Sequence, residues 1–265
     1  MPQNFVNSAI PIENRSMFDS FRDNPIESNA QIVDAWLAKQ PPAVRKNAVS
    51  DVPLHLRPFN RYNYMIKSKI KPPLEISAAL KYASVQTIAY YAKSLNVIFR
   101  PALNLISERL LSAIDNKIPV LTNMSNVEFQ REINKRTNSF QVTMIRQVEN
   151  DMSKYDKAQG EVLRYLESEL LFLLGFPEDL FEIWKNSHVK SVLRDRQTAE
   201  KFETNYQRKS GDASTFFGNT LVLMDVLLSR HDINSINLLL AAGDESVIFF
   251  KPGVTANYDS SSRPV

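Results

Sequence analysis

The sequence predicts an α+β fold, in which helices and antiparallel strands come from separate stretches of one chain of 265 residues. Two apolar runs joined by Gly243 and Asp244, from Leu238 to Phe250, predict a tight β-hairpin. Its runs have almost no polar residue, which is typical of central strands covered on both faces. A helix predicted from about Thr215 to Ser229 is apolar on nearly every side and must be buried.

The composition excludes several classes of site. The chain is 43% hydrophobic and 23% charged, which is typical of a globular protein. It has no cysteine, which excludes disulfides, thiolate zinc sites and cysteine nucleophiles and fits a reducing, intracellular setting. Its three histidines are far apart, so any metal would be held by oxygen ligands. The net charge of +3 is small, and neither a signal peptide nor a membrane-spanning segment is predicted.

The N-terminal part of the chain is predicted to contain a poorly periodic arm followed by a short helix. Residues 1–28 are polar and are predicted to form an irregular arm. Asn29 is a good cap for a short helix, which Pro41 ends. The apolar stripe of that helix consists of Ile32, Val33, Trp36 and Leu37.

A basic segment follows from Val52 to Leu74, without an acidic residue but with aromatic residues between the cations. Alternation places Lys67, Lys69 and Lys71 on one face of an extended segment, a row of cations suited to a triphosphate or an RNA backbone. The same pattern also fits a solvated strand face.

The next predicted elements are helices. Residues 74–116 are predicted to be helical, with Pro101 at a first helical position and an apolar stripe that includes Ile106 and Leu110. Ser125 and Glu128 form a capping-box pattern for another helix.

Residues 142–151 have the character of a strand, and a helix over 157–174 follows, ended by Gly175. The core positions predicted for that helix are Val162, Leu166, Leu170 and Leu173. A further helix begins after Pro177.

Strands are predicted near 189–193 and 202–206, before the buried helix that begins at about Thr215. That helix contains Thr215 and Asn219 on one face, and it contains Gly218, although glycine costs a helix about 1 kcal/mol relative to alanine. Either hydrogen bonds within the core or contact with a ligand explains these residues.

Asp244 and Glu245 lie at the tip of the predicted hairpin. If the tip is buried, two adjacent carboxylates require a cation, and a divalent metal is the obvious candidate. An ordinary surface turn is the alternative, because Gly-Asp is common in turns.

Three motifs, in this order and spacing, resemble those of RNA-dependent RNA polymerases of alphavirus-like positive-strand RNA viruses, such as tobamovirus and closterovirus replicases. The stretch from Asp151 to Gln159, Asp-Met-Ser-Lys-Tyr-Asp-Lys-Ala-Gln, is similar to motif A. Gln-Arg-Lys-Ser-Gly-Asp from Gln207, with Thr215, Asn219 and Thr220 after it, is similar to motif B. Gly243-Asp-Glu takes the place of motif C, and residues 64–74 more loosely resemble motif F.

The resemblance implies a right-hand polymerase with an irregular arm (1–28), a fingers-like region (29–141) and a palm (142–265), and with the thumb missing. It also implies template-directed RNA synthesis by two Mg²⁺ ions, or Mn²⁺, about 3.5 to 4 Å apart. The catalytic and metal-binding residues would be Asp151, Asp244 and Glu245. The nucleotide-binding residues would be Asp156, Ser210, Gly211, Thr215, Asn219, Lys67 and Lys71. The RNA-binding residues would be Arg61, Lys69, Arg208 and Lys209.

The expected partners are RNA template and primer, nucleoside triphosphates, and capping and helicase regions of the same replicase, in replication complexes of the host cytoplasm. Two departures from the family bear on activity: Glu245 stands where a second Asp is usual, and the chain ends at Val265, as expected of a piece of a larger replicase. A non-catalytic, RNA-binding palm fragment is therefore the alternative. A reverse transcriptase fits less well, because Asp156 with Asn219 suits selection for ribose.

Overall fold

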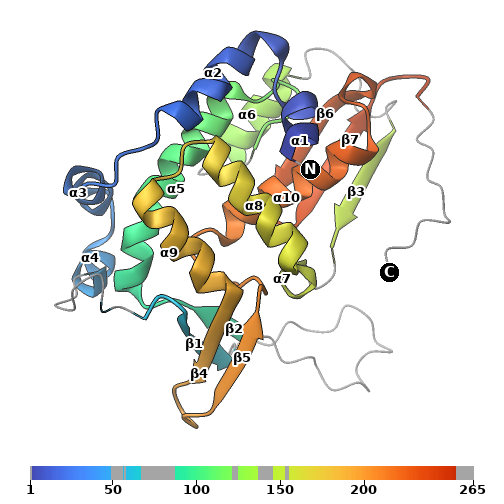
Figure 1. Ribbon diagram of the computed structural model, residues 1–265. Coiled ribbons are helices and arrows are strands. Elements are labelled where there is room, and N and C mark those ends of the chain that lie inside the picture. Colours follow the sequence, from blue (N-terminus) through green and yellow to red (C-terminus); the bar gives the residue numbers. More distant parts are fainter. Residues whose placement is uncertain are drawn as a thin grey trace, which may run out of the picture.

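The computed structural model of the chain describes residues 2–48, 56, 58–66, 87–120, 125–136, 146–152 and 155–254 (Figure 1). The helices of this part are α1 (Pro2–Ala9), α2 (Ile12–Asp23), α3 (Ala30–Ala38), α4 (Pro42–Ala48), α5 (Lys93–Ala113), α6 (Asn126–Arg136), α7 (Tyr155–Ala158), α8 (Glu161–Leu173), α9 (Glu178–Val189) and α10 (Thr215–Arg230). Its strands are β1 (Arg61–Ile66), β2 (Thr87–Tyr90), β3 (Gln147–Asp151), β4 (Lys190–Asp195), β5 (Lys201–Asn205), β6 (Ile236–Ala242) and β7 (Glu245–Phe250). Helices combined with mainly antiparallel strand pairs confirm the α+β class.

The predicted hairpin is present as β6 and β7, in an antiparallel sheet of order β3-β7-β6. Ala242 pairs with Glu245 across a two-residue turn, and Gly243 has a φ of +66°, as primed hairpin turns require. Strand β7 is central, as predicted, but β6 lies at the edge of the sheet. A parallel bridge between Val120 and Ala241 covers part of that edge.

Both faces of the hairpin are covered, which explains its unbroken apolar sequence. On one face, residues such as Leu239 and Ile248 belong to the main core, where β6 contacts α10. On the other face, Leu238, Leu240 and Phe249 pack against side chains of α6. The prediction that this hairpin is buried on both faces is confirmed for the strands.

A second sheet has the strand order β2-β1-β4-β5 and lies below the helices in Figure 1. Strands β1 and β4 run parallel, and the other neighbours are antiparallel. Tyr62 of β1 stacks on Tyr91, which follows β2, with ring centroids 4.1 Å apart. This buried aromatic pair joins the sheet to the main core.

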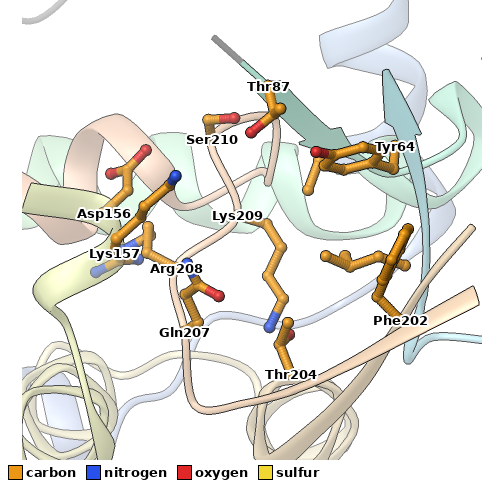
Figure 2. Close-up of a pocket in the computed structure, with 12 residues that line it drawn as sticks. Tyr64, Thr87, Asp156, Lys157, Phe202, Thr204, Gln207, Arg208, Lys209 and Ser210 are labelled. Atoms are coloured by element: carbon orange, nitrogen blue, oxygen red, sulfur yellow. The ribbon is translucent and has the colours of Figure 1, made fainter. Parts of the chain in front are cut away.

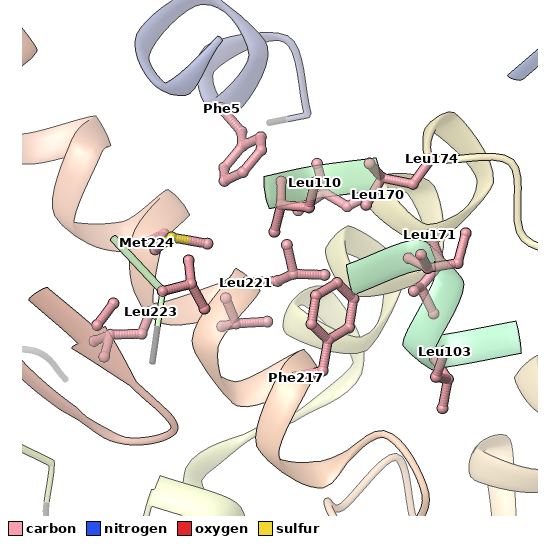
Figure 3. Packing of buried hydrophobic residues seen from close by; sticks show 14 of the residues in the cluster. Phe5, Leu103, Leu110, Leu170, Leu171, Leu174, Phe217, Leu221, Leu223 and Met224 are labelled. Atoms are coloured by element: carbon pink, nitrogen blue, oxygen red, sulfur yellow. The ribbon is translucent and has the colours of Figure 1, made fainter. Parts of the chain in front are cut away.

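Helix α10 lies at the centre of the core and packs against α1, α8 and β6. Leu221, Val222, Leu223 and Met224 are fully buried on successive sides of it, among side chains of several other helices (Figure 3). The prediction of a buried helix that is apolar on nearly every side is confirmed, except that Phe216, which was predicted to be buried with it, is exposed.

The prediction of an irregular arm over residues 1–28 is wrong, because α1 and α2 occupy most of it. Phe5, Ala9 and Phe18 are buried in the core, and α1 packs on α10. The spacing of Phe5, Val6 and Ala9 puts them on one helix face, which is the signal that the polar composition concealed.

The continuous helix predicted over 74–116 is also wrong. Residues 87–90 form strand β2, helix α5 begins at Lys93, and Pro101 lies inside it and not in its first turn. The buried stripe of Ile106 and Leu110 is as predicted. Residues 74–86 lie outside the described residues.

The ends of the helices were predicted more accurately from local sequence signals than the faces that the helices bury. Asn29 accepts a hydrogen bond from the Ile32 amide at the start of α3, and Ser125 and Glu128 form the capping box of α6. Gly175, with a φ of +77°, follows the end of α8, where a Cβ atom would lie 2.2 Å from the Phe21 carbonyl oxygen. Helix α8 itself begins at Glu161 and not at 157, and Val162 is exposed and not part of the core.

Candidate functional site

The three predicted catalytic carboxylates lie at one end of the three-stranded sheet. Asp151, the last residue of β3, pairs with Glu245, the first residue of β7. Asp244 precedes Glu245 in the hairpin turn. The side chain of Asp151 lies outside the described part of the structure. The strand register alone therefore brings Asp151 and Glu245 together, although they are far apart in sequence.

Asp244 and Glu245 are exposed, so the expected burial of the hairpin tip is wrong. Exposed carboxylates need no compensating cation, and burial cannot be the argument for a metal. The donors themselves still fit Mg²⁺, which takes carboxylate oxygens and keeps several water ligands. Among the described residues, no cluster of three or more Asp, Glu, His or Cys side chains is placed to hold a metal ion.

A hydrogen bond ties the hairpin turn to the central helix. The amide of Gly243 donates to Oγ1 of Thr220 on α10, over 2.9 Å. Thr220 is completely buried, so this hydrogen bond anchors the hairpin turn to the core. The residue next to Asp244 is thus held by Thr220, which belongs to the stretch that resembles motif B.

Asp156 and Asn219, predicted to act together, are in direct contact. Nδ2 of Asn219 donates to Oδ1 of Asp156 over 2.8 Å, from α10 to the short helix α7. Asn219 is buried, whereas Asp156 is half-buried and lines a cavity. The polar face of α10 had two explanations, hydrogen bonding within the protein or contact with a ligand. The first is present as the bond between Asn219 and Asp156, and the second stays open because Asp156 lines the cavity.

That cavity has a volume of about 310 Å³ and lies between the four-stranded sheet and the loop after β5 (Figure 2). Its lining includes aromatic side chains of β1 and β5, Tyr64 and Phe202, opposite Asp156 and the exposed Ser210. It combines a carboxylate, a hydroxyl and aromatic faces, which suits a ribose and a base.

Arg208, predicted to bind RNA, has a buried guanidinium group that is bound within the protein; its side chain also lines the cavity, and its RNA contact stays a prediction. Its Nη1 donates to Oε1 of Glu167 over 2.7 Å, and its Nε donates to Oε1 of Gln159 over 2.9 Å. Arg164 forms a second ion pair with Glu167. Burial alone would raise the pKa of Glu167, but the two guanidinium groups hold that pKa below its usual range.

Gly218 is required by this ion cluster. A Cβ atom at position 218 would lie 1.9 Å from Oε1 of Glu167 and 2.6 Å from Nη1 of Arg208. The glycine inside the buried helix thus allows the ion pair between α8 and the loop before α10.

Gly211 and Thr215 hold the same loop in place. A Cβ atom on Gly211 would lie 2.4 Å from that of Tyr90, and the Gly211 amide donates to the Ala89 carbonyl. The hydroxyl of Thr215 donates to the Lys209 carbonyl over 2.6 Å. Both residues have structural contacts, and their predicted contact with a nucleotide stays a prediction.

Asp212, His188 and Tyr62 form a second buried polar cluster, which the sequence did not indicate. The His188 ring contacts the Asp212 carboxylate, and the Tyr62 hydroxyl donates to that of Tyr91 over 2.6 Å. Burial alone would raise the pKa of Asp212, but contact with His188 and the nearby Arg164 lowers it. No local pattern indicates this cluster, because His188 and Asp212 are 24 positions apart and meet only in the fold.

Lys209 is a buried cation. Its ammonium group forms no hydrogen bond within the described residues and lies 5.3 Å from the centre of the Tyr62 ring. Burial, followed by repulsion from Arg164, lowers its pKa to about 7. Its side chain is buried and borders the cavity (Figure 2), so contact with a ligand there is open to it, and its predicted RNA contact stays a prediction.

Replacing Lys209 with methionine is expected to stabilise the chain at neutral pH by about 1 to 3 kcal/mol, because a buried charge with no hydrogen-bond partner is removed. Since the lowered pKa is about 7, the unfolded state binds more protons than the folded state from there up to the usual lysine range, about pH 10.4. The wild-type free energy of unfolding should therefore rise with pH across this window, and that of the variant should not. Urea unfolding at several pH values, with the exposed Lys157→Met as the control, measures both. Equal pH slopes in wild type and Lys209→Met would contradict this assignment.

Of the four remaining predicted residues, the structure describes only Arg61. Arg61 is exposed and lines a different cavity, of about 650 Å³, with Arg194 and Lys201. Lys67, Lys69 and Lys71 lie outside the described residues.

Comparison with known proteins identifies a family for this chain. A family model described as RNA dependent RNA polymerase matches residues 3–262. The replicase large subunit of Tobamovirus Ob is 32% identical over 238 residues, which is 90% of this chain and 14% of that protein. That of tobacco rattle virus (strain SYM) is 32% identical over 88% of this chain and 13% of its own length. The chain thus spans about one seventh of the curated relatives that it matches.

Among solved structures, the crystal structure of the RNA-dependent RNA polymerase of a human picobirnavirus has a similar fold. The TM-score is 0.59 with 15% sequence identity, over 94% of this chain and 51% of that chain. At this identity the likeness concerns the fold. The match of the family model to nearly the whole chain establishes that this chain belongs to the RNA-dependent RNA polymerase family.

Proposed function

We propose that this chain carries out template-directed RNA synthesis as the palm and part of the fingers of a viral replicase. The observation that carries the proposal is the convergence of three motifs. The end of β3 and the β6–β7 turn supply Asp151, Asp244 and Glu245, and the adjoining α7 and α10 supply the bonded pair Asp156 and Asn219. On this proposal the three-stranded sheet, α8 and α10 belong to the palm, and strands β1 and β2 of the four-stranded sheet belong to the fingers-like region.

In this mechanism Asp151 and Asp244 would hold Mg²⁺, with Mn²⁺ as an alternative, and Glu245 would add negative charge. When bound, the metal ions activate the primer hydroxyl and neutralise the departing pyrophosphate. The Gly243–Thr220 hydrogen bond would hold the turn that carries Asp244 and Glu245 in a fixed position relative to α10, whose Asn219 contacts Asp156. The protein thus contributes mainly positioning and charge.

Asp156 would recognise the incoming ribonucleotide. Its Oδ1 is held by Asn219, which leaves the other carboxylate oxygen to accept a hydrogen bond from a ribose 2′-hydroxyl in the cavity. A deoxyribose lacks that hydroxyl and would leave the carboxylate without its partner. Sites that bond a substrate hydroxyl reject analogues without it strongly.

The test is the preference for ribonucleotides over deoxyribonucleotides. Asp156→Ala and Asn219→Ala are each expected to lower that preference about tenfold or more, because each removes part of the 2′-hydroxyl contact. Both should change RNA binding much less. The ratio of kcat/KM for matched ribo- and deoxyribonucleotides, measured in a full-length replicase that carries this chain, decides it. Unchanged ratios in both variants would return Asn219 to a purely structural role.

The proposed partners follow from the same reading: an RNA template and primer, nucleoside triphosphates, and the capping and helicase regions of a replicase in the host cytoplasm. None of the described helices has the length and apolar character to cross a membrane.

A further inference from the structure

A chain of buried hydrogen bonds leads from an ion pair in the core to the proposed ribose contact. Glu167 binds Arg208, and Arg208 Nε donates to Gln159 Oε1 over 2.9 Å. Nε2 of Gln159 then donates to Oδ1 of Asn219 over 2.8 Å, and Asn219 donates in turn to Asp156. Of these five hydrogen-bonded residues, four are buried, and only Asp156, at the cavity wall, is partly accessible to solvent.

The direction of these bonds is fixed by the charges at the two ends. A guanidinium group has donors only, so the atom of Gln159 that faces Arg208 must be its oxygen. Gln159 therefore turns its NH₂ group to Asn219, whose facing atom must be the carbonyl oxygen. That leaves the NH₂ group of Asn219 for the carboxylate of Asp156, which accepts only.

We propose that Gln159 is a positioning residue for ribose selection, because it fixes the orientation of the Asn219 amide. Without a donor at position 159, no hydrogen bond from the core side determines whether the oxygen or the NH₂ group of the Asn219 amide faces Asp156. A reversed amide would place its oxygen against the Asp156 carboxylate, which repels it and disturbs the 2′-hydroxyl contact. This inference rests on the proposed function of Asp156 and Asn219.

Gln159→Glu tests the inference by replacing one NH₂ group with an oxygen. Glutamate can still accept from Arg208, so the contact with the ion pair is kept, but an ionised carboxylate cannot donate to Asn219. We expect the preference for ribo- over deoxyribonucleotides to fall about tenfold, with KM for the ribonucleotide rising and RNA binding unchanged. If Gln159 only packs and binds Arg208, Gln159→Glu leaves the preference unchanged, and that result overturns the proposal.

A second substitution provides a rescue. In Gln159→Glu with Asp156→Asn, a reversed Asn219 donates to the new carboxylate at position 159 and accepts from the new amide at position 156. Both bonds of Asn219 are then satisfied in the opposite direction, while Arg208 still donates to position 159. The double variant is expected to prefer ribonucleotides more strongly than either single variant. If Gln159→Glu incorporates nothing, recovery of incorporation in the double variant is the supporting result. A double variant no better than the worse single variant contradicts the proposal.

Asn219→Ala, measured alongside in the same full-length replicase, separates two kinds of failure. If Asn219→Ala leaves ribose preference unchanged, the proposed function of this pair fails. If Asn219→Ala lowers the preference and Gln159→Glu does not, only the positioning role of Gln159 fails.

Discussion

Replacing Asp244 with alanine is expected to lower the rate of nucleotide incorporation more than a hundredfold and to leave RNA binding nearly unchanged. The expected loss is large because Asp244 is a metal ligand in the proposed function. Removing such a ligand takes away several kcal/mol of transition-state stabilisation, and about 1.4 kcal/mol corresponds to a factor of ten. The fold should tolerate the change, since Asp244 is an exposed turn residue. Asp151→Ala is expected to have the same effect, because Asp151 lies on β3 directly opposite Glu245 of β7.

Single-turnover incorporation by a full-length replicase, together with RNA binding, measures both effects. Asp179→Ala is a matched control, because it removes an exposed carboxylate from the first turn of α9 instead. More than about one hundredth of the wild-type rate in Asp244→Ala would rule out Asp244 as a metal ligand.

Replacing Glu167 with glutamine is expected to lower the free energy of unfolding by about 3 to 5 kcal/mol, because it leaves Arg164 and Arg208 as buried cations without their shared carboxylate. The two side chains have nearly the same shape, so the effect isolates charge. Since the pKa of Glu167 is lowered on folding, the stability from its charge is present above its unfolded pKa of about 4.3. It is lost as the pH falls through the lowered, folded-state pKa, so the variant should lose less stability in acid.

Urea unfolding of the chain at neutral and acidic pH measures this difference. Glu169→Gln, which changes a partly exposed glutamate of the same helix, is the control. A loss below about 1 kcal/mol in Glu167→Gln would mean that the buried ion cluster is not essential to the fold.

The elements that the sequence predicted well are those with local signals. The Ser125–Glu128 capping box, the end of α8 at Gly175 and the turn at Gly243 each depend on residues within a few positions. The hairpin and α10 were predictable because burial on all sides requires apolar residues on all sides. The pairing of Asp156 with Asn219 followed from the resemblance and is present as a hydrogen bond.

Several features that the sequence did not predict depend on partners that are far away in the sequence. Arg208 has the character of a surface cation until Glu167, 41 positions earlier, is placed beside it. Strand β2 exists because β1 pairs with it. Helix α1 is stabilised by the central helix near the other end of the chain. Of these three, only α1 has a local pattern, the shared face of Phe5, Val6 and Ala9, and that pattern does not indicate which element it packs against.

Template-directed incorporation of a single nucleotide tests the proposed function most directly. A full-length replicase that carries this chain is given primed RNA templates that differ only in the next base, with each nucleoside triphosphate in turn, with Mg²⁺ or with a chelator. We expect addition of the complementary ribonucleotide only, and only with the metal. RNA binding without any addition would support the non-catalytic fragment, and addition that ignores the template base or persists in the chelator would contradict template-directed, metal-dependent synthesis.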